Sequence, residues 1–301
     1  MQKYLGDIHS VQNQKGGVGK STFANVLAYD CVNNGYKTAL IDLDPQATQT
    51  GAFMGYSYGA FSGNNSSNIT NIFNAKKFEP IKIITTKYID NPNKKKIGET
   101  HYFEEKMTID FFPSNHELLH MIESDSFSRE NKIQFIVNFL NALKNQYDKI
   151  IVDSPPSFGI ITTAILICSN TILVSIPTKN VDTDGMTGYF NQLDKAYEKY
   201  NINQLQKIII LPNMFNKIAV DAKETLNDIK RTPNLLQQTN KLRHIKCVVN
   251  EAFPQRSSIQ EAPSINNSFL VPYIMDFARS KNGDLLIALK KLSKEVVEYS
   301  C

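Results

Sequence analysis

Short runs of consecutive apolar residues alternate along this chain with longer segments whose apolar residues recur every three or four positions. The short runs predict buried strands, and the periodic segments predict helices with one buried face. The predicted strands are 8–11, 37–42, 108–112, 149–153, 171–176 and 207–211, and the predicted helices are 21–29, 131–147, 185–200 and 285–297. Strands without polar alternation, separated by helices, are typical of a parallel sheet. We therefore predict an α/β fold, a single-domain, mostly parallel twisted sheet of seven or eight strands with helices on both faces.

The stretch 56–106 departs from this alternation. It contains Gly-Asn-Asn-Ser-Ser at 63–67 and Asn-Lys-Lys-Lys at 93–96, and predicts only a helical turn near 70–73 and a strand near 81–85. A chain of 301 residues has an ordinary length for one α/β domain. We predict that residues 1–301 form one domain, that 56–106 is a loop-rich elaboration of it, and that a helix at about 284–299 closes it.

A glycine-rich octet follows the first predicted strand and precedes the first predicted helix. Its residues are Lys15, Gly16, Gly17, Val18, Gly19, Lys20, Ser21 and Thr22. Glycines allow successive N–H groups to face a phosphate, and the helix directs its positive end at the same anion. In such a loop Lys20 reaches the β- and γ-phosphates and the Ser21 hydroxyl ligates Mg²⁺. The general motif has a glycine where this chain has Gln14, and Lys15 at the entrance is the distinguishing residue.

Carboxylates stand at the ends of two other predicted strands. Asp42 and Asp44 follow the second strand, and Asp153 ends the run Ile-Ile-Val-Asp at 150–153. Asn213 follows a later strand. Ligands of doubly wound sheets bind at the carboxyl ends of the strands, so these side chains are expected to converge on the phosphate loop. There they can hold Mg²⁺ with its waters and orient an attacking water.

Basic residues are concentrated between 217 and 256, where eight lysines and arginines stand against four acids, a net charge of +4 that equals the net charge of the whole chain. This pattern is consistent either with a nucleic-acid footprint or with an ordinary solvated surface, and charge alone does not decide between them. The candidate DNA-binding residues are Lys230, Arg231, Lys241, Arg243, Lys246 and Arg256.

Composition argues against a secreted protein, a membrane protein and a protein held together by disulfides or zinc. A hydrophobic content of 42% with 21% charged residues is typical of globular proteins, and no apolar run reaches 18 residues. We expect no secretion signal and no membrane association. The four cysteines are scattered, at Cys31, Cys168, Cys247 and Cys301, so neither a zinc site nor a disulfide framework is expected.

Three motifs together resemble the ParA/MinD family of deviant Walker-motif ATPases, most strongly its ParA branch, which partitions plasmids and chromosomes. They are the octet 15–22, Asp-Leu-Asp-Pro-Gln at 42–46 and Asp-Ser-Pro-Pro at 153–156. Asp-Phe-Phe-Pro-Ser-Asn at 110–115, Phe-Pro-Gln-Arg at 253–256 and Glu-Ala-Pro-Ser at 261–264 are similar to further family segments. The resemblance covers nearly the whole chain and is weakest over 56–106.

The resemblance implies roles for individual residues. Lys15 matches the signature lysine that reaches the partner subunit's nucleotide, and Lys20 matches the phosphate lysine. Asp44 matches the acid needed for hydrolysis; with Lys15 and Lys20 it makes up the expected catalytic set. The expected metal site is Ser21, Asp42 and Asp153, and the expected adenine contacts are Asn213 and Pro254. This chain has Gln255 where the family often has a basic residue, with Arg256 one place on.

The resemblance also implies partners and a cycle. ATP and Mg²⁺ are the expected cofactors, and ATP binding is expected to form a homodimer that holds nonspecific double-stranded DNA. A ParB-like centromere-binding protein would stimulate an otherwise slow ATP hydrolysis. The implied location is cytoplasmic and nucleoid-associated. Because the loop begins at Lys15, we expect no helix-turn-helix domain before it and no operator binding by this chain.

Three alternatives compete with this interpretation. A MinD-like membrane-cycling ATPase would need a basic amphipathic last helix, and the leucine stripe of 285–297 beside three lysines is compatible with one, although Glu295 and Glu298 reduce its positive charge. A nitrogenase-reductase-like enzyme would need cluster-binding cysteines, whereas Cys31 and Cys168 fall in apolar segments. A scaffold without hydrolysis is disfavoured by the intact lysines and acids.

Overall fold

The computed structural model describes residues 5–54, 67–74, 76–90, 102–178, 183–216, 218–238, 242–254 and 283–297. Several sequence predictions therefore lie outside the described residues. These are the DNA-contact candidates Lys241 and Arg256, the residue Gln255, the segment 261–264, Cys301, and 56–66, 75 and 91–101 of the expected elaboration.

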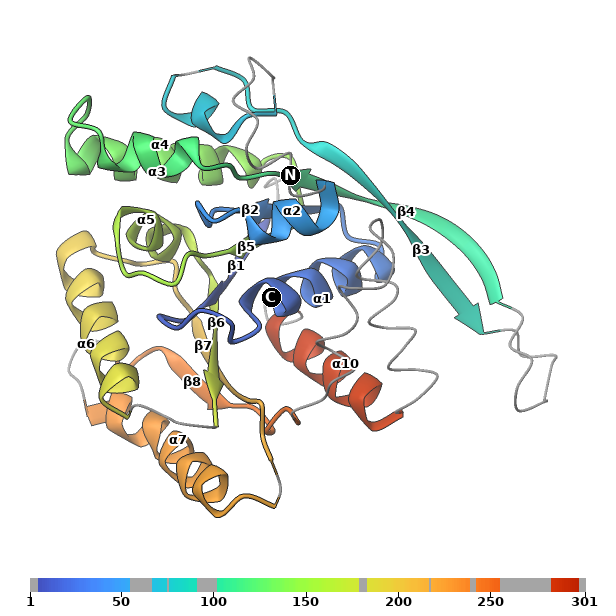
Figure 1. The fold of residues 1–301 in the computed structure, drawn as a ribbon, viewed down its shortest axis with the longest axis vertical. Helices are drawn as coiled ribbons and strands as arrows, with labels where there is room; N and C mark the ends of the chain where they lie inside the picture. Colours follow the sequence, from blue (N-terminus) through green and yellow to red (C-terminus); the bar gives the residue numbers. More distant parts are fainter. Residues whose placement is uncertain are drawn as a thin grey trace.

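Within the described residues the core is one eight-stranded sheet of order β3-β4-β2-β5-β1-β6-β7-β8 (Figure 1). The strands are β1 (Asp7–Gln12), β2 (Thr38–Asp42), β3 (Ile81–Asp90), β4 (Tyr102–Phe112), β5 (Lys149–Asp153), β6 (Thr171–Pro177), β7 (Lys207–Asn213) and β8 (Lys246–Val249). All neighbouring pairs run parallel except β3 and β4. The predicted fold class is confirmed, with eight described strands.

Helices cover both faces of this sheet (Figure 1). They are α1 (Lys20–Asn33), α2 (Thr48–Met54), η1 (Ile69–Ile72), α3 (Glu117–Glu123), α4 (Arg129–Leu143), α5 (Ile160–Cys168), α6 (Thr183–Tyr200), α7 (Val220–Gln238) and α10 (Gly283–Val297). Adjacent strand residues supply opposite faces: Leu40 packs in the cluster of α1 and α10, whereas Ile41 packs in the cluster of α4 and α5. The strands are therefore apolar on both sides, which is why their sequences lack alternation.

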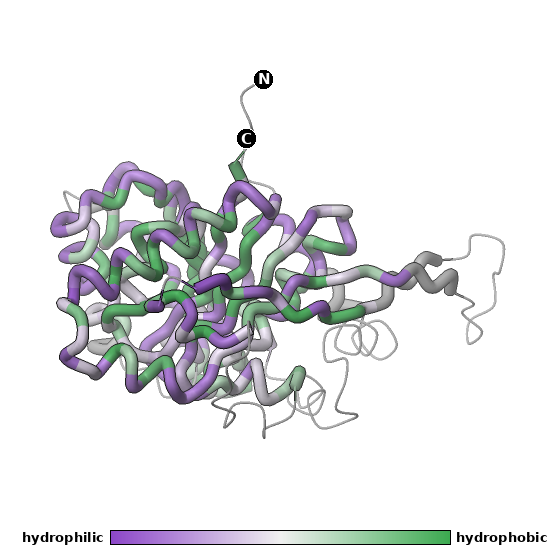
Figure 2. Tube along the Cα trace, turned by 90° about the horizontal axis from the view of Figure 1, so that it is seen from above, coloured by the Kyte–Doolittle hydropathy of each residue, from purple (hydrophilic) through white to green (hydrophobic). Residues whose placement is uncertain are grey.

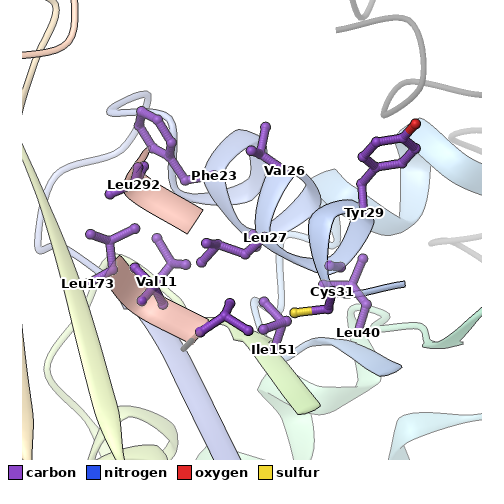
Figure 3. Packing of buried hydrophobic residues seen from close by; sticks show 14 of the residues in the cluster. Val11, Phe23, Val26, Leu27, Tyr29, Cys31, Leu40, Ile151, Leu173 and Leu292 are labelled. Atoms are coloured by element: carbon purple, nitrogen blue, oxygen red, sulfur yellow. The ribbon is translucent and has the colours of Figure 1, made fainter. Parts of the chain in front are cut away.

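The α1 face carries the core that positions the phosphate loop. Figure 3 shows Leu27 and Cys31 of α1 directed at Val11 and Ile151 of the strands, and Phe23 of α1 beside Leu292 of α10. Leu40 and Leu173 of the strands belong to the same cluster. Each of these side chains is buried. Fully burying a side chain of this size stabilises the fold by about 2 kcal/mol, so α1 is held firmly against β1 and the loop between them has fixed ends.

The sequence prediction did not include α2, α3, α7 or β8, and two further parts of the fold differ from it. The strands expected at 81–85 and 108–112 extend to ten and eleven residues and pair antiparallel over ten positions, so part of the expected loop-rich stretch is a β-ribbon. The segment Ile160–Cys168 is a helix that is apolar on nearly every side. Because it is buried all round, its sequence has no polar face from which helical periodicity could be recognised.

Candidate nucleotide site at the carboxyl ends of the strands

The phosphate loop connects β1 to α1 and depends on its glycines. Gly17 and Gly19 have φ of 70° and 84°, in the left-handed region that other residues rarely adopt. A Cβ on Gly19 would lie 3.1 Å from Asn213 Nδ2 and 3.3 Å from Cε2 of Phe23. Gly19 is also the N-cap of α1, with no capping side chain. The start of α1 is therefore open to an anion.

Side chains from neighbouring strands hold the loop in place. The carbonyl of Val18 accepts hydrogen bonds from Ser175 Oγ at 2.7 Å and from Asn213 Nδ2 at 2.9 Å. Asn13 Oδ1 accepts one from the Lys15 amide at 3.0 Å. Two segments far away in sequence and the neighbouring Asn13 thus restrain the loop before any ligand binds, and this preorganisation lowers the entropic cost of binding.

The two lysines of the loop differ in environment. Lys20 is buried, and its Nζ donates a hydrogen bond to the carbonyl of Lys15 at 3.1 Å. Burial lowers the pKa of Lys20, while the nearby carboxylates of Asp153 and Asp44 act to raise it. Lys15 is exposed at the entrance of the loop. Lys20 is therefore turned into its own site, whereas Lys15 is at the surface.

Asp153 has the character of a metal ligand. It is 1% exposed, and its Oδ1 has no hydrogen-bond partner among the described residues. Burial raises its pKa well above the usual range, Asp42 raises it further, and a hydrogen bond from the Ser21 side chain opposes the shift. A buried carboxylate oxygen without a partner, next to a hydroxyl and the phosphate loop, fits Mg²⁺, which binds through one or two protein oxygens, waters and phosphates.

Both carboxylate oxygens of Asp42 accept hydrogen bonds from the segment that follows β2. Its Oδ2 accepts hydrogen bonds from Thr50 N at 2.9 Å and Thr50 Oγ1 at 2.8 Å, and its Oδ1 accepts one from Asp44 N at 3.0 Å. Thr50 Oγ1 in turn accepts a bond from Ser114 N at 2.8 Å, at the end of β4. Burial raises the pKa of Asp42 to about 7. These contacts give Asp42 a positioning role, and its expected place in the metal site stays a prediction.

Asp44 lies on the turn after β2, close enough to Lys20 for their charges to interact. It is half-buried, its Oδ1 accepts a hydrogen bond from Gln46 N at 2.9 Å, and its carbonyl accepts one from Ala47 N at 2.8 Å. Burial raises its pKa, and the charge of Lys20 opposes that shift. The electrostatic contact with Lys20 places Asp44 beside the phosphate loop, as the spacing of the acids predicted.

The two expected adenine contacts differ in surroundings. Asn213 is buried, and its amide is bonded to the loop carbonyl of Val18. Pro254 is partly exposed and forms an isolated parallel bridge with Phe215. The structure shows Asn213 supporting the loop, and contact of either residue with adenine remains a prediction.

Sequence reasoning missed several residues of the site. Ser175 and Asn13 support the loop, and Thr50 holds Asp42, yet none of them belongs to the motifs that were recognised. A usable signal existed for Ser175, the one polar residue between the apolar positions 172–174 and Ile176 of a buried strand. A hydroxyl inside such a run needs a partner.

Comparisons with known proteins identify the family of this chain. The family model described as "AAA domain" matches residues 6–207. The chain is 25% identical over 286 residues to the chromosome partitioning protein ParA of Myxococcus xanthus, covering 95% of this chain and 87% of the relative. It is 24% identical over 289 residues to the sporulation initiation inhibitor protein Soj of Bacillus subtilis, covering 95% and 98%. This chain belongs to the ParA/Soj family of ATPases.

Solved structures give the same assignment of fold. The structure of pNOB8 ParA matches with a TM-score of 0.72 at 16% identity, covering 98% of both chains. The same protein bound to nonspecific DNA matches with a TM-score of 0.67 at 15% identity, covering 98% of this chain and 100% of that one. The ATP complex of a variant of Cyanothece McdA matches with a TM-score of 0.66 at 15% identity, covering 99% and 98%. At these identities the likeness establishes the fold alone.

The candidate DNA-binding residues that the structure describes lie at the β8 end of the sheet, at the opposite end of the strand order from β3. Lys230 and Arg231 are exposed on α7, and Arg243 and Lys246 are exposed just before and at the start of β8. Arg231 pairs with Asp228 at 3.3 Å. Leu242 and Ile245, beside Arg243 and Lys246, pack in the same apolar cluster as Ile229 of α7. The four basic residues therefore belong to two adjoining elements, α7 and the segment that enters β8 (Figure 1).

None of the described helices is both long enough and apolar enough to span a bilayer.

Proposed function

We propose that this chain is a DNA-partitioning ATPase that dimerises when it binds ATP and Mg²⁺, and that the dimer binds DNA nonspecifically. The observation that carries the proposal is the contrast between the two loop lysines. Lys20 is buried and bonded within its own loop, whereas Lys15 is exposed at the entrance. An exposed cation beside the phosphate site could contact a nucleotide held by a second subunit, which would make hydrolysis depend on assembly.

The remaining residues divide the work at one site. The loop 15–22 would hold the phosphates, and Ser21 with Asp153 would hold Mg²⁺, which neutralises phosphate charge when bound. Asp44 would orient the attacking water, since it lies beside Lys20 on a turn. Asp42 would act by fixing that turn, through its bonds to Thr50 and Asp44.

Nonspecific DNA binding is supported by charge and by likeness. Lys230, Arg231, Arg243 and Lys246 are exposed on adjoining elements, and a structural neighbour, pNOB8 ParA, was solved with nonspecific DNA. Phosphate contacts by lysine and arginine provide most of such affinity, and a dimer doubles them. A ParB-like centromere-binding protein is the proposed stimulator of hydrolysis. The proposed location is accordingly the nucleoid within the cytoplasm.

Two measurements on the full chain test this proposal. The molar mass in solution and the co-sedimentation with DNA are compared without nucleotide, with ADP, and with a slowly hydrolysed ATP analogue plus Mg²⁺. Of the three conditions, we expect only the analogue with Mg²⁺ to produce the dimer and to raise DNA affinity at least about ten-fold. Lys15→Ala should bind the analogue but neither form the dimer nor gain DNA affinity. Lys290→Ala, at an exposed lysine of α10, is the matched control. Equal DNA binding in all three states would contradict the proposal.

A MinD-like membrane cycle is the second candidate, and α10 bears on it. Leu289, Leu292 and Val296, which form much of its apolar stripe, are buried in the cluster that contains α1. The stripe that a bilayer would receive is thus already covered by protein. Co-sedimentation with anionic liposomes in the presence of ATP should therefore be negative, and ATP-dependent binding would favour the membrane cycle.

A further inference from the structure

Helix α6 contacts the segment 12–14, which leads into the phosphate loop. The Tyr189 hydroxyl donates a hydrogen bond to Gln12 Oε1 at 2.7 Å. Gln14 Nε2 donates one to Gln192 Oε1 at 3.0 Å. Positions 189 and 192 are three residues apart, so they share one face of the helix. One face of α6 therefore holds two of the three residues that directly precede Lys15.

α6 is itself anchored to the sheet by its apolar face. Its buried residues Tyr189, Phe190, Leu193 and Ala196 pack in one cluster with residues of β6 and β7. This cluster lies in the half of the sheet opposite the β3–β4 ribbon, which Figures 1 and 2 show leaving the body of the protein. Because close packing fixes the backbone of α6, the side chains that reach the segment 12–14 start from a rigid support.

Tyr189 gives Gln12 a partner inside the sheet. Both side chains are buried, at 4% and 1% exposure. Gln12 Nε2 also donates to Ser10 Oγ at 3.1 Å, and the hydroxyls of Ser10 and Ser169 lie 3.0 Å apart. Burial raises the pKa of Tyr189, so its hydroxyl stays protonated and remains a donor. Removal of this hydroxyl would take away the hydrogen bond that orients the buried Gln12 amide.

Asn13, the middle residue of the segment, joins these contacts to Lys15. Its Nδ2 donates a hydrogen bond to the carbonyl of Ser175 in β6, and its Oδ1 accepts one from the Lys15 amide at 3.0 Å. Each residue of the segment 12–14 is thus bonded through its side chain to β6 or α6. The backbone position of Lys15 is therefore set by these contacts.

The other end of the loop has different partners. The carbonyl of Val18 is bonded to Ser175 Oγ of β6 and to Asn213 Nδ2 of β7, and neither of these partners lies on α6. Loss of the α6 contacts should therefore displace Lys15 while the loop amides near Lys20 stay in place to bind phosphate. The geometry separates the support of Lys15 from the support of the phosphate-binding part.

We propose that Tyr189 and Gln192 of α6 are positioning residues for Lys15, and that they act through Gln12 and Gln14. The inference rests on the proposed function, in which Lys15 contacts a nucleotide held by a second subunit. Displacing a reacting group by about 1 Å can reduce a rate about 100-fold. The α6 contacts thereby set the assembly and hydrolysis that depend on Lys15, and leave the affinity of one subunit for ATP unchanged.

Tyr189→Phe and Gln192→Ala test this in the full chain with ATP and Mg²⁺. Each should lower the hydrolysis rate per subunit at saturating ATP at least about five-fold. Affinity for a slowly hydrolysed ATP analogue, measured by calorimetry, should stay within about two-fold of the parent value. Because Gln192 is exposed, its variant should fold even if Tyr189→Phe proves unstable.

Two matched controls come from the same helix. Tyr197→Phe removes a hydroxyl that lies 2.6 Å from His244 Nε2, in the segment that enters β8. Asn191→Ala removes an exposed amide next to Gln192. Both controls should hydrolyse ATP at the parent rate, because neither side chain is bonded to the segment 12–14.

Hydrogen exchange of the chain without nucleotide tests the positioning itself. The Lys15 amide is bonded to Asn13 Oδ1, so its exchange rate reports how well the segment 12–14 is ordered. Tyr189→Phe and Gln192→Ala should accelerate exchange of this amide, and exchange of the amides of β7 should not change.

Three results would overturn the proposal. They are hydrolysis at the parent rate in both α6 variants, a loss of analogue affinity as large as the loss of rate, and parent-like exchange of the Lys15 amide. Failure of the proposed function has a different signature, which is hydrolysis at the parent rate in Lys15→Ala. In that case the exchange measurement still decides whether α6 holds Lys15, because it requires neither nucleotide nor assembly.

Discussion

Replacing Thr50 by valine removes one hydroxyl from the network that joins the ends of β2 and β4. That hydroxyl donates to Asp42 Oδ2 at 2.8 Å and accepts from Ser114 N at 2.8 Å, and Thr50 and Asp42 are fully buried. Valine has nearly the same shape, so the main loss is two hydrogen bonds, one of them to a carboxylate. Leaving buried partners without these bonds costs about 1–3 kcal/mol each, so we expect unfolding free energy to fall by about 3 kcal/mol near pH 8.

The loss of unfolding free energy caused by Thr50→Val should be larger at high pH than at low pH. The pKa of Asp42 is about 7 in the folded protein against 3.8 as its ordinary value. Between these values the folded state holds a proton that the unfolded state has released, so this group lowers stability as pH rises. The Thr50 hydroxyl favours the charged form, and its removal raises the folded pKa further. Thr50→Val should therefore lower the unfolding free energy by about 1.5 kcal/mol near pH 5 and by about twice that near pH 8.

Urea unfolding followed by circular dichroism is the suitable assay, because the chain has no tryptophan. Thr48→Val is the matched control, since Thr48 is exposed at the start of the same helix, and Thr50→Ser should retain most of the stability. The charges of Asp44, Asp153 and Lys20 are common to all variants, so the comparison isolates Thr50. A loss equal to that of Thr48→Val, or one that is the same at both pH values, would refute the reasoning.

Three further predictions concern the nucleotide and DNA sites. Lys20→Ala should weaken ATP binding at least about 100-fold in calorimetry, because it removes the buried cation of the loop; unchanged affinity would place the phosphates elsewhere. Asp44→Ala should bind ATP and DNA but hydrolyse ATP at least about ten-fold more slowly, and hydrolysis at the parent rate would show that its assigned role is wrong. Arg243→Glu with Lys246→Glu should reduce DNA binding about ten-fold and flatten its salt dependence, with nucleotide affinity and a Lys290→Glu control unchanged.

The sequence by itself determined most strands, the helices α1, α4, α6 and α10, and the phosphate loop, but it did not indicate α7, which has 19 residues. Buried parallel strands are continuous apolar runs, and the glycines at 17 and 19 occupy the positive-φ positions that a loop of this kind requires. These are local properties, carried by neighbouring residues. The acids at the strand ends could be placed near the loop for a similar reason, because the carboxyl ends of parallel strands share one edge.

Tertiary structure decided which partners those residues have. The bond from Asn213 to Val18 joins positions 195 residues apart, and the engagement of Asp42 depends on Thr50 and on Ser114 of another strand end. The ribbon at β3 and β4 was also recognised only in part, because the sequence of β3 shows neither regular alternation nor a continuous apolar run. Periodicity along a chain reports which faces are buried, but hydrogen-bond partners and the length of a pairing are set by segments that meet only after folding.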